Sequence, residues 1–279
     1  MVDMVGKARE IRVEIIKMLL EAGSGHTAGA MGAADLFAAL YFGGIVRYKK
    51  ENPYDENRDR VVLSCGHYAP ALYASLALAG FFPVEDLKTL RKLGSSLQGH
   101  PVRQIRLVGS NYTQLPGVEN TGGPLGQGVS IAVWMALAGK MDKKGWKVVC
   151  LESDAEQQEG QIWEAYETAT KYNLGNLTFV IDRNDIQISG SIGTVMPIGS
   201  LRDKLTSFGL RVFEIDGNNT GEIFSAFEKG KMFPDQPKAV IMRTISGKGV
   251  SFMEGDYRWH GKTPTVDEAE RALQELKIL

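Results

Sequence analysis

Two spacings of apolar residues alternate along the chain. Near the amino end, Ile11, Ile15 and Leu19 fall on one helical stripe, which predicts a helix over residues 3–22 that ends at Gly23. Five later segments are rich in β-branched residues and almost continuously apolar at their centres: residues 59–64, 147–152, 177–182, 210–215 and 238–243. Strands buried on both faces of a sheet have this pattern, so we expect five such strands.

Helical patterns lie between these strands. They cover residues 69–79, 127–141, 161–172, 200–207 and 221–229. This alternation favours a three-layer α/β/α fold, in which a mainly parallel sheet carries helices on both faces. Because no repeat or linker interrupts the pattern, we expect one domain over residues 1–279. The long segment 94–124, rich in glycine, glutamine and asparagine, is expected to serve a function.

Composition narrows the class of protein. The chain has 279 residues, of which 43% are hydrophobic and 23% charged, enough apolar material for a large core. Lysine and arginine number 32 against 33 acidic residues, and no basic run appears, so we expect no nucleic acid partner. Charged residues interrupt the first helix repeatedly, so we expect a cytoplasmic protein without membrane association. Cys65 and Cys150 stand far apart and are expected to be buried, reduced thiols.

Glycine is abundant and clustered. The chain has 32 glycines, well above the usual share of about 7%. The clusters lie at residues 23–25, 43–44, 122–128 and 247–249, between the periodic segments. Such clusters suggest that backbone comes close to a ligand.

Polar residues follow two of the predicted strands where each ends. Asp154 comes after segment 147–152, and Asn184 follows segment 177–182, 30 residues later. Because ligands bind at the carboxyl ends of parallel strands, we expect these two side chains to lie side by side. With the backbone carbonyl of Ile186 they would supply three hard oxygen ligands for a small divalent cation. Helix caps and turns use the same residue types, so the spacing alone leaves both interpretations open.

Several motifs match one known family, in the family's order. They are residues 23–26 (GSGH), 64–67 (SCGH), 97–101 (LQGHP), 121–128 (TGGPLGQG), 154–160 (DAEQQEG), 181–190 (IDRNDIQISG), 247–253 (GKGVSFM) and 259–261 (WHG). Asp154 and Asn184 look like the thiamine diphosphate motif of transketolases, an aspartate between two glycines followed by an asparagine. The chain therefore resembles the transketolases from about residue 7 to its end.

The resemblance implies the thiamine diphosphate-binding fold and two cofactors, thiamine diphosphate and Mg²⁺, with Ca²⁺ or Mn²⁺ as substitutes for the metal. A full transketolase is more than twice this length and continues into a pyrimidine-binding domain and a C-terminal domain. The chain is similar to the diphosphate-binding subunit of a split transketolase, whose partner, the C-terminal transketolase subunit, carries the pyrimidine-binding domain. An α2β2 assembly that is active only with the partner is expected.

All four histidines of the chain fall inside these motifs. By resemblance, His67 and His260 contact the diphosphate, and His260 also reaches the reacting centre. His26 and His100 face the substrate hydroxyls, so His26, His100 and His260 are catalytic candidates. Imidazoles suit these roles because they donate to a developing alkoxide and exchange protons near neutral pH.

The resemblance assigns further residues to the cofactor. Gly123 and Leu125 would lie beside the aminopyrimidine, where glycine allows close approach and leucine supports the bent shape of the cofactor. Ala155 follows the metal ligand Asp154 at the diphosphate. Glu159 is similar to a buried glutamate near the subunit interface that couples to the partner's carboxylates, and is both a catalytic and a cofactor-binding candidate. A helix that begins near Glu159 would direct its positive end at the diphosphate.

Some positions depart from the family pattern. Ser153 and Ala155 replace the two glycines of the motif, and Ser153 could crowd the diphosphate or donate a hydrogen bond to it. Thr27 and Ala28 stand where Pro-Gly is usual, and Cys65 stands where lysine or asparagine is common.

The resulting hypothesis is an enzyme subunit that transfers a two-carbon ketol unit from a ketose or ketose phosphate to an aldose acceptor. Two alternatives stay open. One is a subunit of a deoxyxylulose-phosphate-synthase-like or other thiamine diphosphate enzyme. The other is a non-catalytic homologue that regulates a partner, which Ser153 and Ala155 suggest.

Overall fold

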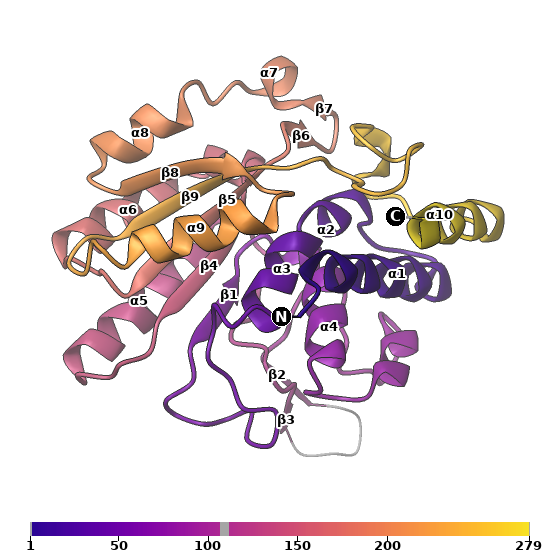
Figure 1. Ribbon diagram of the computed structural model, residues 1–279, viewed down its shortest axis with the longest axis horizontal. Coiled ribbons are helices and arrows are strands. Elements are labelled where there is room, and N and C mark those ends of the chain that lie inside the picture. Colours follow the sequence, from indigo (N-terminus) through magenta and orange to yellow (C-terminus); the bar gives the residue numbers. More distant parts are fainter. Residues whose placement is uncertain (1, 107–111, 279) are drawn as a thin grey trace.

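A five-stranded parallel sheet forms the centre of the protein, in a computed structural model that describes residues 2–106 and 112–278 (Figure 1). The strands are β1 (Arg60–Leu63), β4 (Val148–Ser153), β5 (Leu177–Arg183), β8 (Arg211–Asp216) and β9 (Lys238–Arg243). They are arranged in the order β1-β4-β5-β9-β8, and each neighbouring pair is parallel. The five predicted strands and the parallel sheet are confirmed.

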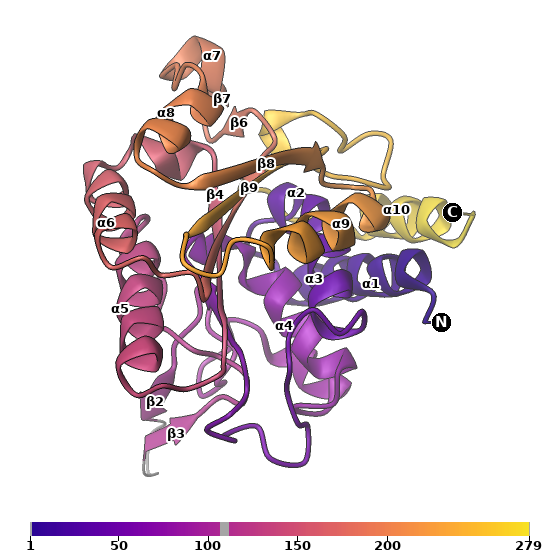
Figure 2. The same ribbon diagram turned by 60° about the vertical axis from the view of Figure 1, so that its left-hand side comes forward.

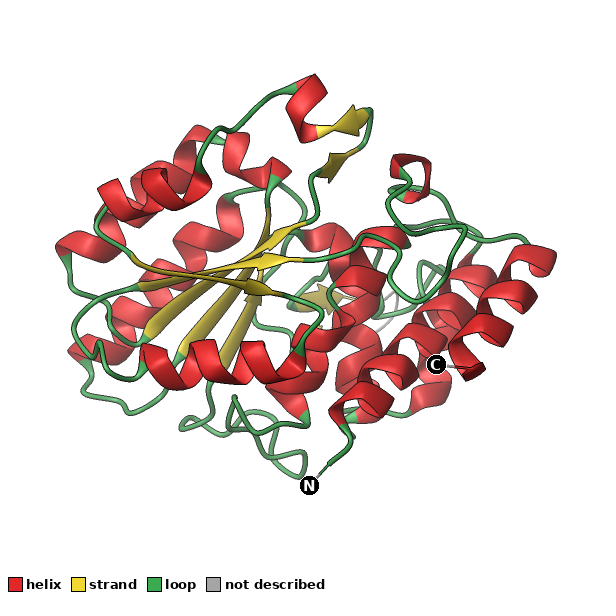
Figure 3. Cartoon of the chain, turned by 45° about the horizontal axis from the view of Figure 1, so that its top comes forward, coloured by secondary structure: helices red, strands yellow, loops and turns green. Residues whose placement is uncertain are grey.

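Helices cover both faces of the sheet, which confirms the three-layer fold (Figures 2 and 3). On one face lie α1 (Met4–Ala22), α2 (Ala28–Gly32), α3 (Ala34–Tyr41), α4 (Ala69–Leu78) and α9 (Thr220–Gly230), with α10 (Val266–Ile278) packed against α1. On the other lie α5 (Gln127–Met141), α6 (Gly160–Lys171) and α8 (Leu201–Ser207). Strand residues alternate between the two cores, so that Val61 and Leu63 face the first core and Val62 the second.

The first helix has the boundaries that its sequence predicts. The side chain of Asp3 accepts a hydrogen bond from the N–H of Gly6 (2.9 Å), which caps the amino end of α1. Gly23 adopts a positive φ of 63° and donates its N–H to the carbonyl of Leu19 (3.0 Å). A left-handed residue with this bond is the usual glycine ending of a helix.

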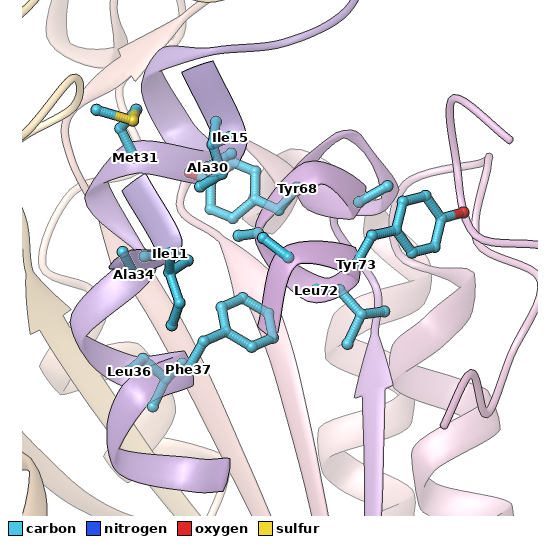
Figure 4. Close-up of a cluster of buried hydrophobic side chains, with 14 of the residues drawn as sticks. Ile11, Ile15, Ala30, Met31, Ala34, Leu36, Phe37, Tyr68, Leu72 and Tyr73 are labelled. Carbon is cyan, nitrogen blue, oxygen red and sulfur yellow. The ribbon is translucent and has the colours of Figure 1, made fainter. Parts of the chain in front are cut away.

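A buried ion pair sets how α1 docks on its neighbours. Arg12 donates to the carbonyl of Met31 (3.1 Å) and pairs with Asp35 at the start of α3. Both charged side chains are more than 90% buried. Apolar side chains of the same helices, including Ile15 and Phe37, form a buried cluster between α1 and α4 (Figure 4). The pair therefore ties α1 to α3, and the loss of either partner would leave a buried charge unpaired.

Several elements have no counterpart in the sequence prediction. The segment that forms α2 and α3 is buried on every side, so it lacks the amphipathic spacing of a surface helix. Helix α10 was also not predicted, although its buried residues Ala269, Ala272 and Leu276 have the spacing of one helical face. Strand β8 is predicted correctly in position, but it lies at the sheet edge and is half-exposed instead of buried on both faces. Segment 94–124 contains an antiparallel pair of strands, β2 (Gln104–Arg106) and β3 (Tyr112–Gln114), and lies partly outside the described residues.

Short elements follow the carboxyl ends of the strands. They are the 3₁₀ helix η1 (Gly66–Tyr68) after β1, η3 (Ala155–Gln158) after β4, and the pair β6 (Ile186–Gln187) and β7 (Gly190–Ser191) with α7 (Ile192–Val195) after β5. Two further 3₁₀ helices are η2 (Val84–Thr89) and η4 (Tyr257–Trp259). Because β1, β4 and β5 are neighbours, the loops that follow them meet at one edge of the sheet. Within the described ranges, no helix is both long and apolar enough to span a membrane.

Candidate functional site

Asp154 lies in the first turn beyond β4, beside the end of β5. Its N–H donates to the carbonyl of Asp182 (3.0 Å). Its side chain is fully buried, and its two oxygens accept from the backbone N–H groups of Ala155 (2.8 Å) and Asp185 (2.6 Å). Burial, and then repulsion from Asp182, raises the pKa of Asp154 to about 8. The carboxylate thus has the capping role that its spacing allows, and it keeps free lone pairs for a cation that would stabilise its charge.

The amide of Asn184 is held in one orientation. Its Nδ2 donates to the hydroxyl of Tyr68 (2.9 Å) and to Asp182 Oδ2 (2.9 Å), whereas its Oδ1 accepts from the N–H of Ile186 (3.0 Å). The fully buried Asp182 also accepts from the hydroxyls of Tyr68 and Thr244. Because the carboxylate of Asp182 accepts hydrogen bonds, the NH₂ group of Asn184 faces Asp182 and its oxygen faces Ile186. The predicted oxygen ligands Asn184 and Ile186 therefore lie in one turn.

Asp182 and Tyr68 are site residues that were not predicted from the sequence. The signal for Asp182 was a carboxylate at the end of an otherwise apolar strand, and Tyr68 directly follows the SCGH motif. In the described part of the chain, no three His, Cys, Asp or Glu side chains are grouped so as to hold a metal ion. A cation at this edge would therefore need amide and carbonyl oxygens, such as those of Asn184 and Ile186, beside Asp154.

Glu156 joins three loops through one buried carboxylate. Its Oε1 accepts from the hydroxyl of Ser64, after β1, and from the N–H of Gly126 (2.6 Å), before α5. Its Oε2 accepts from the N–H of Ser153 (3.1 Å) at the end of β4. Burial raises the pKa of Glu156, and the three hydrogen bonds oppose that rise. Glu156 was not among the predicted site residues, although it lies within the DAEQQEG motif.

A second buried carboxylate, that of Glu152, contacts η3 and α6. Glu152 Oε2 accepts from the hydroxyl of Tyr166 (2.6 Å) and from Gln157 Nε2 (2.9 Å), while Oε1 has no partner among the described residues. Burial, followed by repulsion from Glu156, raises the pKa of Glu152 to about 8. Through these hydrogen bonds Glu152 ties η3 to α6.

All four histidines meet above this edge. The ring centroid of His26 lies 5.5 Å from that of His67, 5.8 Å from that of His100 and 5.6 Å from that of His260. Burial lowers the pKa of every one of them, that of His26 to about 4. The cluster is therefore uncharged at neutral pH, and each ring can donate at one nitrogen and accept at the other. His26 Nδ1 is buried and has no hydrogen-bond partner in the described part of the molecule.

Two contacts connect the histidine cluster to the rest of the fold. The ring of Tyr68, whose hydroxyl contacts Asn184, lies 4.6 Å from the ring of His67. The hydroxyl of Thr27 donates to the carbonyl of Lys262 (2.6 Å) and thereby joins the loops of His26 and His260. A proline at position 27 has no hydroxyl, so the departure of Thr27 from the family pattern supplies a contact between the two ends of the chain.

Several glycines bring loops against one another. A Cβ on Gly66 would lie 1.6 Å from the carbonyl oxygen of Gly122, and a Cβ on Gly128 would lie 2.5 Å from the Cα of Ser64. At these positions the absence of a Cβ allows close packing of the SCGH and TGGPLGQG loops. Gly123 differs, because it is exposed and nothing in the described part of the chain lies within 4 Å of the place where its Cβ would be.

The remaining candidates lie around the same edge. Leu125 is partly buried, and its carbonyl accepts from Gln161 Nε2 (2.9 Å). Ala155 is partly buried directly after Asp154. Glu159 is exposed at the amino end of α6 in the single chain, and its expected burial at a subunit interface stays a prediction. Its burial would require contact with another chain, because the described segments around it leave the start of α6 uncovered.

The chain matches one protein family over nearly its whole length. The family described as "Transketolase, thiamine diphosphate binding domain" matches residues 4–277. One subunit of the apulose-4-phosphate transketolase of Phocaeicola vulgatus is 39% identical over 265 residues, which cover 95% of this chain and 90% of that protein. The 6-deoxy-6-sulfo-D-fructose transketolase subunit SqwG of Clostridium sp. is 39% identical over 276 residues, 99% of this chain and 97% of that protein.

Longer relatives match over part of their length. Human transketolase is 36% identical over 270 residues, which cover 96% of this chain and 41% of that protein. The solved structure of transketolase from Leishmania mexicana has a TM-score of 0.90 at 28% identity and covers 99% of this chain and 42% of that chain. The solved structure of transketolase from Campylobacter jejuni has a TM-score of 0.85 at 30% identity and covers 98% of this chain and 42% of that chain.

The lowered pKa of His26 predicts how the stability of the fold depends on pH. Folded His26 titrates near pH 4, whereas the unfolded chain has the ordinary value of 6.5. Its contribution to the free energy of unfolding is complete above pH 6.5 and is lost as the pH falls towards 4. His26 is partly exposed, and solvent screening therefore weakens its effect on stability. His26→Asn should reduce the difference in unfolding free energy between pH 7 and pH 5 by about 1 kcal/mol. Urea unfolding at the two pH values measures this difference, and an unchanged difference in the variant would refute the assignment of a neutral, buried His26.

Proposed function

The chain belongs to the transketolase family, and we propose that it is the diphosphate- and metal-binding subunit of a two-chain transketolase. The observation that carries the proposal is the meeting of Asp154, Asn184 and Ile186 at one edge of the sheet, beside four uncharged histidines. Family membership makes the protein part of a thiamine diphosphate-dependent enzyme. The alternatives of a different thiamine diphosphate enzyme and of a regulatory homologue have no comparable support.

The lengths of the relatives support a divided enzyme. The chain spans 41% of human transketolase but 90% and 97% of two relatives named as subunits. We therefore assign residues 1–279 to one diphosphate-binding domain and expect a partner chain with the pyrimidine-binding domain. The exposed Glu159 is assigned to the contact with that partner, and two copies of each chain would give the common twofold pairing of sites.

The residues present fit a metal-bound diphosphate. Asp154, the oxygen of Asn184 and the carbonyl of Ile186 are hard donors suited to Mg²⁺, and Ca²⁺ or Mn²⁺ could replace it. The buried Asp154 has no positive partner among the described residues, so a cation would offset the cost of its burial. Ala155 would lie at the diphosphate, and Gly123, with open space at its Cα, would lie with Leu125 beside the aminopyrimidine ring.

The histidines are assigned to the diphosphate and to the substrate. Thiamine diphosphate, when bound, supplies the chemistry for transfer of a two-carbon ketol unit from a ketose to an aldehyde. We assign His67 and His260 to hydrogen bonds with the diphosphate, and His26, His100 and His260 to the substrate. An uncharged imidazole can donate N–H to an oxygen on which negative charge develops and can take a hydroxyl proton at its other nitrogen. The partnerless Nδ1 of His26 is the atom that we assign to a substrate hydroxyl.

The substrate class follows from the relatives. One is named for apulose-4-phosphate and another for 6-deoxy-6-sulfo-D-fructose, both sugars that carry an anionic group. We propose that this enzyme also acts on a sugar or sugar phosphate. The two buried, unpaired cysteines are compatible with the reducing cytoplasm, where we place the enzyme.

The division between two chains predicts dependence on a partner. The chain alone should show no transketolase activity, because it holds the residues for one end of the cofactor only. Mixing it with a candidate partner chain should restore activity, and light scattering should show an assembly with two copies of each. Full activity from the purified chain without a partner would contradict the proposal.

The metal assignment predicts a specific loss of cofactor binding. Asp154→Ala should reduce the Mg²⁺-dependent affinity of the assembled enzyme for thiamine diphosphate at least about 100-fold, because the only carboxylate among the assigned ligands is removed. The matched control is Asp185→Asn in the same turn, where the side chain is exposed and asparagine tolerates the positive φ of 58°. Calorimetry of both variants with and without Mg²⁺ makes the comparison. Unchanged affinity in Asp154→Ala would overturn the metal assignment.

A further inference from the structure

A cavity of about 580 Å³ lies at the amino ends of the strands, on the face of the sheet that α9 covers. It is bordered by the segments that lead into β1, β4, β5 and β9 and by the carboxyl half of α9. Val149, the second residue of β4, borders the cavity and Ser153 ends the strand, so about 13 Å separate the cavity from the carboxyl edge at about 3.3 Å per residue. The cavity is therefore distinct from the candidate cofactor site, and none of the residues assigned to the cofactor borders it.

Most charged side chains around the cavity have an opposite charge as partner. Arg47 pairs with Asp59 (3.1 Å), Lys231 with Glu228 (2.5 Å) and Lys144 with Glu56 (3.6 Å). These pairs balance their own charges and need no ligand.

Lys238 and Lys147 differ from the other cations. Within the described ranges, neither ammonium group has a carboxylate within 4 Å. The carboxylate of Asp59 accepts from the backbone N–H of Lys147 (2.8 Å) and pairs with Arg47, and Asp235 is near enough to act on Lys238 electrostatically. Lys238, the first residue of β9, is only 6% exposed, and its ammonium group donates to the carbonyl of Gly175. Burial, and then repulsion from Lys147, lowers the pKa of Lys238 to about 8. A buried ammonium group and a second lysine in the wall of the same cavity are an arrangement that an anion would stabilise.

The rest of the cavity wall is largely apolar. Trp146, Phe213, Phe227 and Val240 border it, and Val240 and Trp146 belong to the buried cores. Its volume lies within the range of about 300–1,000 Å³ that is usual for small-molecule sites, which combine apolar walls with a few polar groups. A free inorganic anion would make no contact with the apolar side chains of the wall. An uncharged apolar molecule would provide no counter-charge for the two lysines.

We propose that this cavity is a second ligand site, which takes a small anion with an apolar body, such as an aryl phosphate or aryl carboxylate. Lys238 and Lys147 bind the anionic group, and the aromatic and aliphatic side chains contact the body of the ligand. The site lies on the opposite edge of the sheet from the cofactor, so both can be occupied together. An acidic segment of a partner chain could use the same lysines, and the experiment separates that occupant from a free small molecule.

The test uses the full chain and three probes: phenyl phosphate, inorganic phosphate and phenol. Saturation-transfer NMR and calorimetry should show saturable binding of phenyl phosphate, at least tenfold tighter than either of the other two probes. Thiamine diphosphate with Mg²⁺ should not displace it. Lys238→Met should weaken the binding at least tenfold, whereas Lys229→Met, an exposed lysine of α9 outside the cavity, should not change it.

A second variant keeps the test decisive if Lys238→Met fails to fold. Lys147 is exposed, so Lys147→Glu should fold and should weaken phenyl phosphate binding at least tenfold through charge reversal. The proposal is overturned if phenyl phosphate does not saturate, if both lysine variants bind it as the unchanged chain does, or if thiamine diphosphate displaces it. Loss of phenyl phosphate binding when the partner chain is added would assign the cavity to the partner and would also overturn the proposal.

Discussion

The carboxylate of Glu156 sets the spacing of the loops around the candidate site. It accepts from the hydroxyl of Ser64 and from the N–H groups of Gly126 and Ser153, which belong to the loops that carry His67, Gly123 and Asp154. All three partners donate, so a group that only accepts satisfies them best. Without it, buried donors in three loops would be left unpaired, at a cost of about 1–3 kcal/mol each. The close packing of Gly66 on Gly122 and of Gly128 on Ser64 follows from the same approach of these loops.

The electrostatics of the site complement a metal-bound diphosphate. The carboxyl edge contains four buried acids, Glu152, Asp154, Glu156 and Asp182, and burial raises the pKa of each. A divalent cation would be the counter-charge for Asp154, as proposed, whereas Asp182 and Glu156 accept hydrogen bonds from the groups around them. The histidines above this edge are uncharged, so they can hydrogen-bond to phosphate or hydroxyl groups without repelling the cation.

The sequence predicted the parts of the fold that follow from hydrophobic periodicity, and local physics explains where it failed. The strands of the sheet can be recognised in the sequence because burial on two faces requires continuous apolar runs. The helix α1 ends at Gly23 as expected. The helices α2 and α3 were missed because complete burial removes amphipathic spacing. The family motifs led to all four histidines and to Asp154, but not to Glu156 or Asp182, because a positioning role depends on which loops meet in space. The exposure of Glu159 could not be foreseen from one chain, since its burial would depend on another.

One buried carboxylate, that of Glu156, holds three loops together around the candidate cofactor site. The most direct test of its role is the Mg²⁺-dependent affinity of the assembled enzyme for thiamine diphosphate in Glu156→Gln, with the exposed Glu167→Gln on α6 as control. Glutamine has nearly the same shape but places an NH₂ group against a donor, so affinity should fall about tenfold, a loss of about 1.4 kcal/mol. Turnover at saturating cofactor should change much less, and the control should match the unchanged enzyme. A correctly assembled Glu156→Gln enzyme with unaltered cofactor affinity would contradict the account.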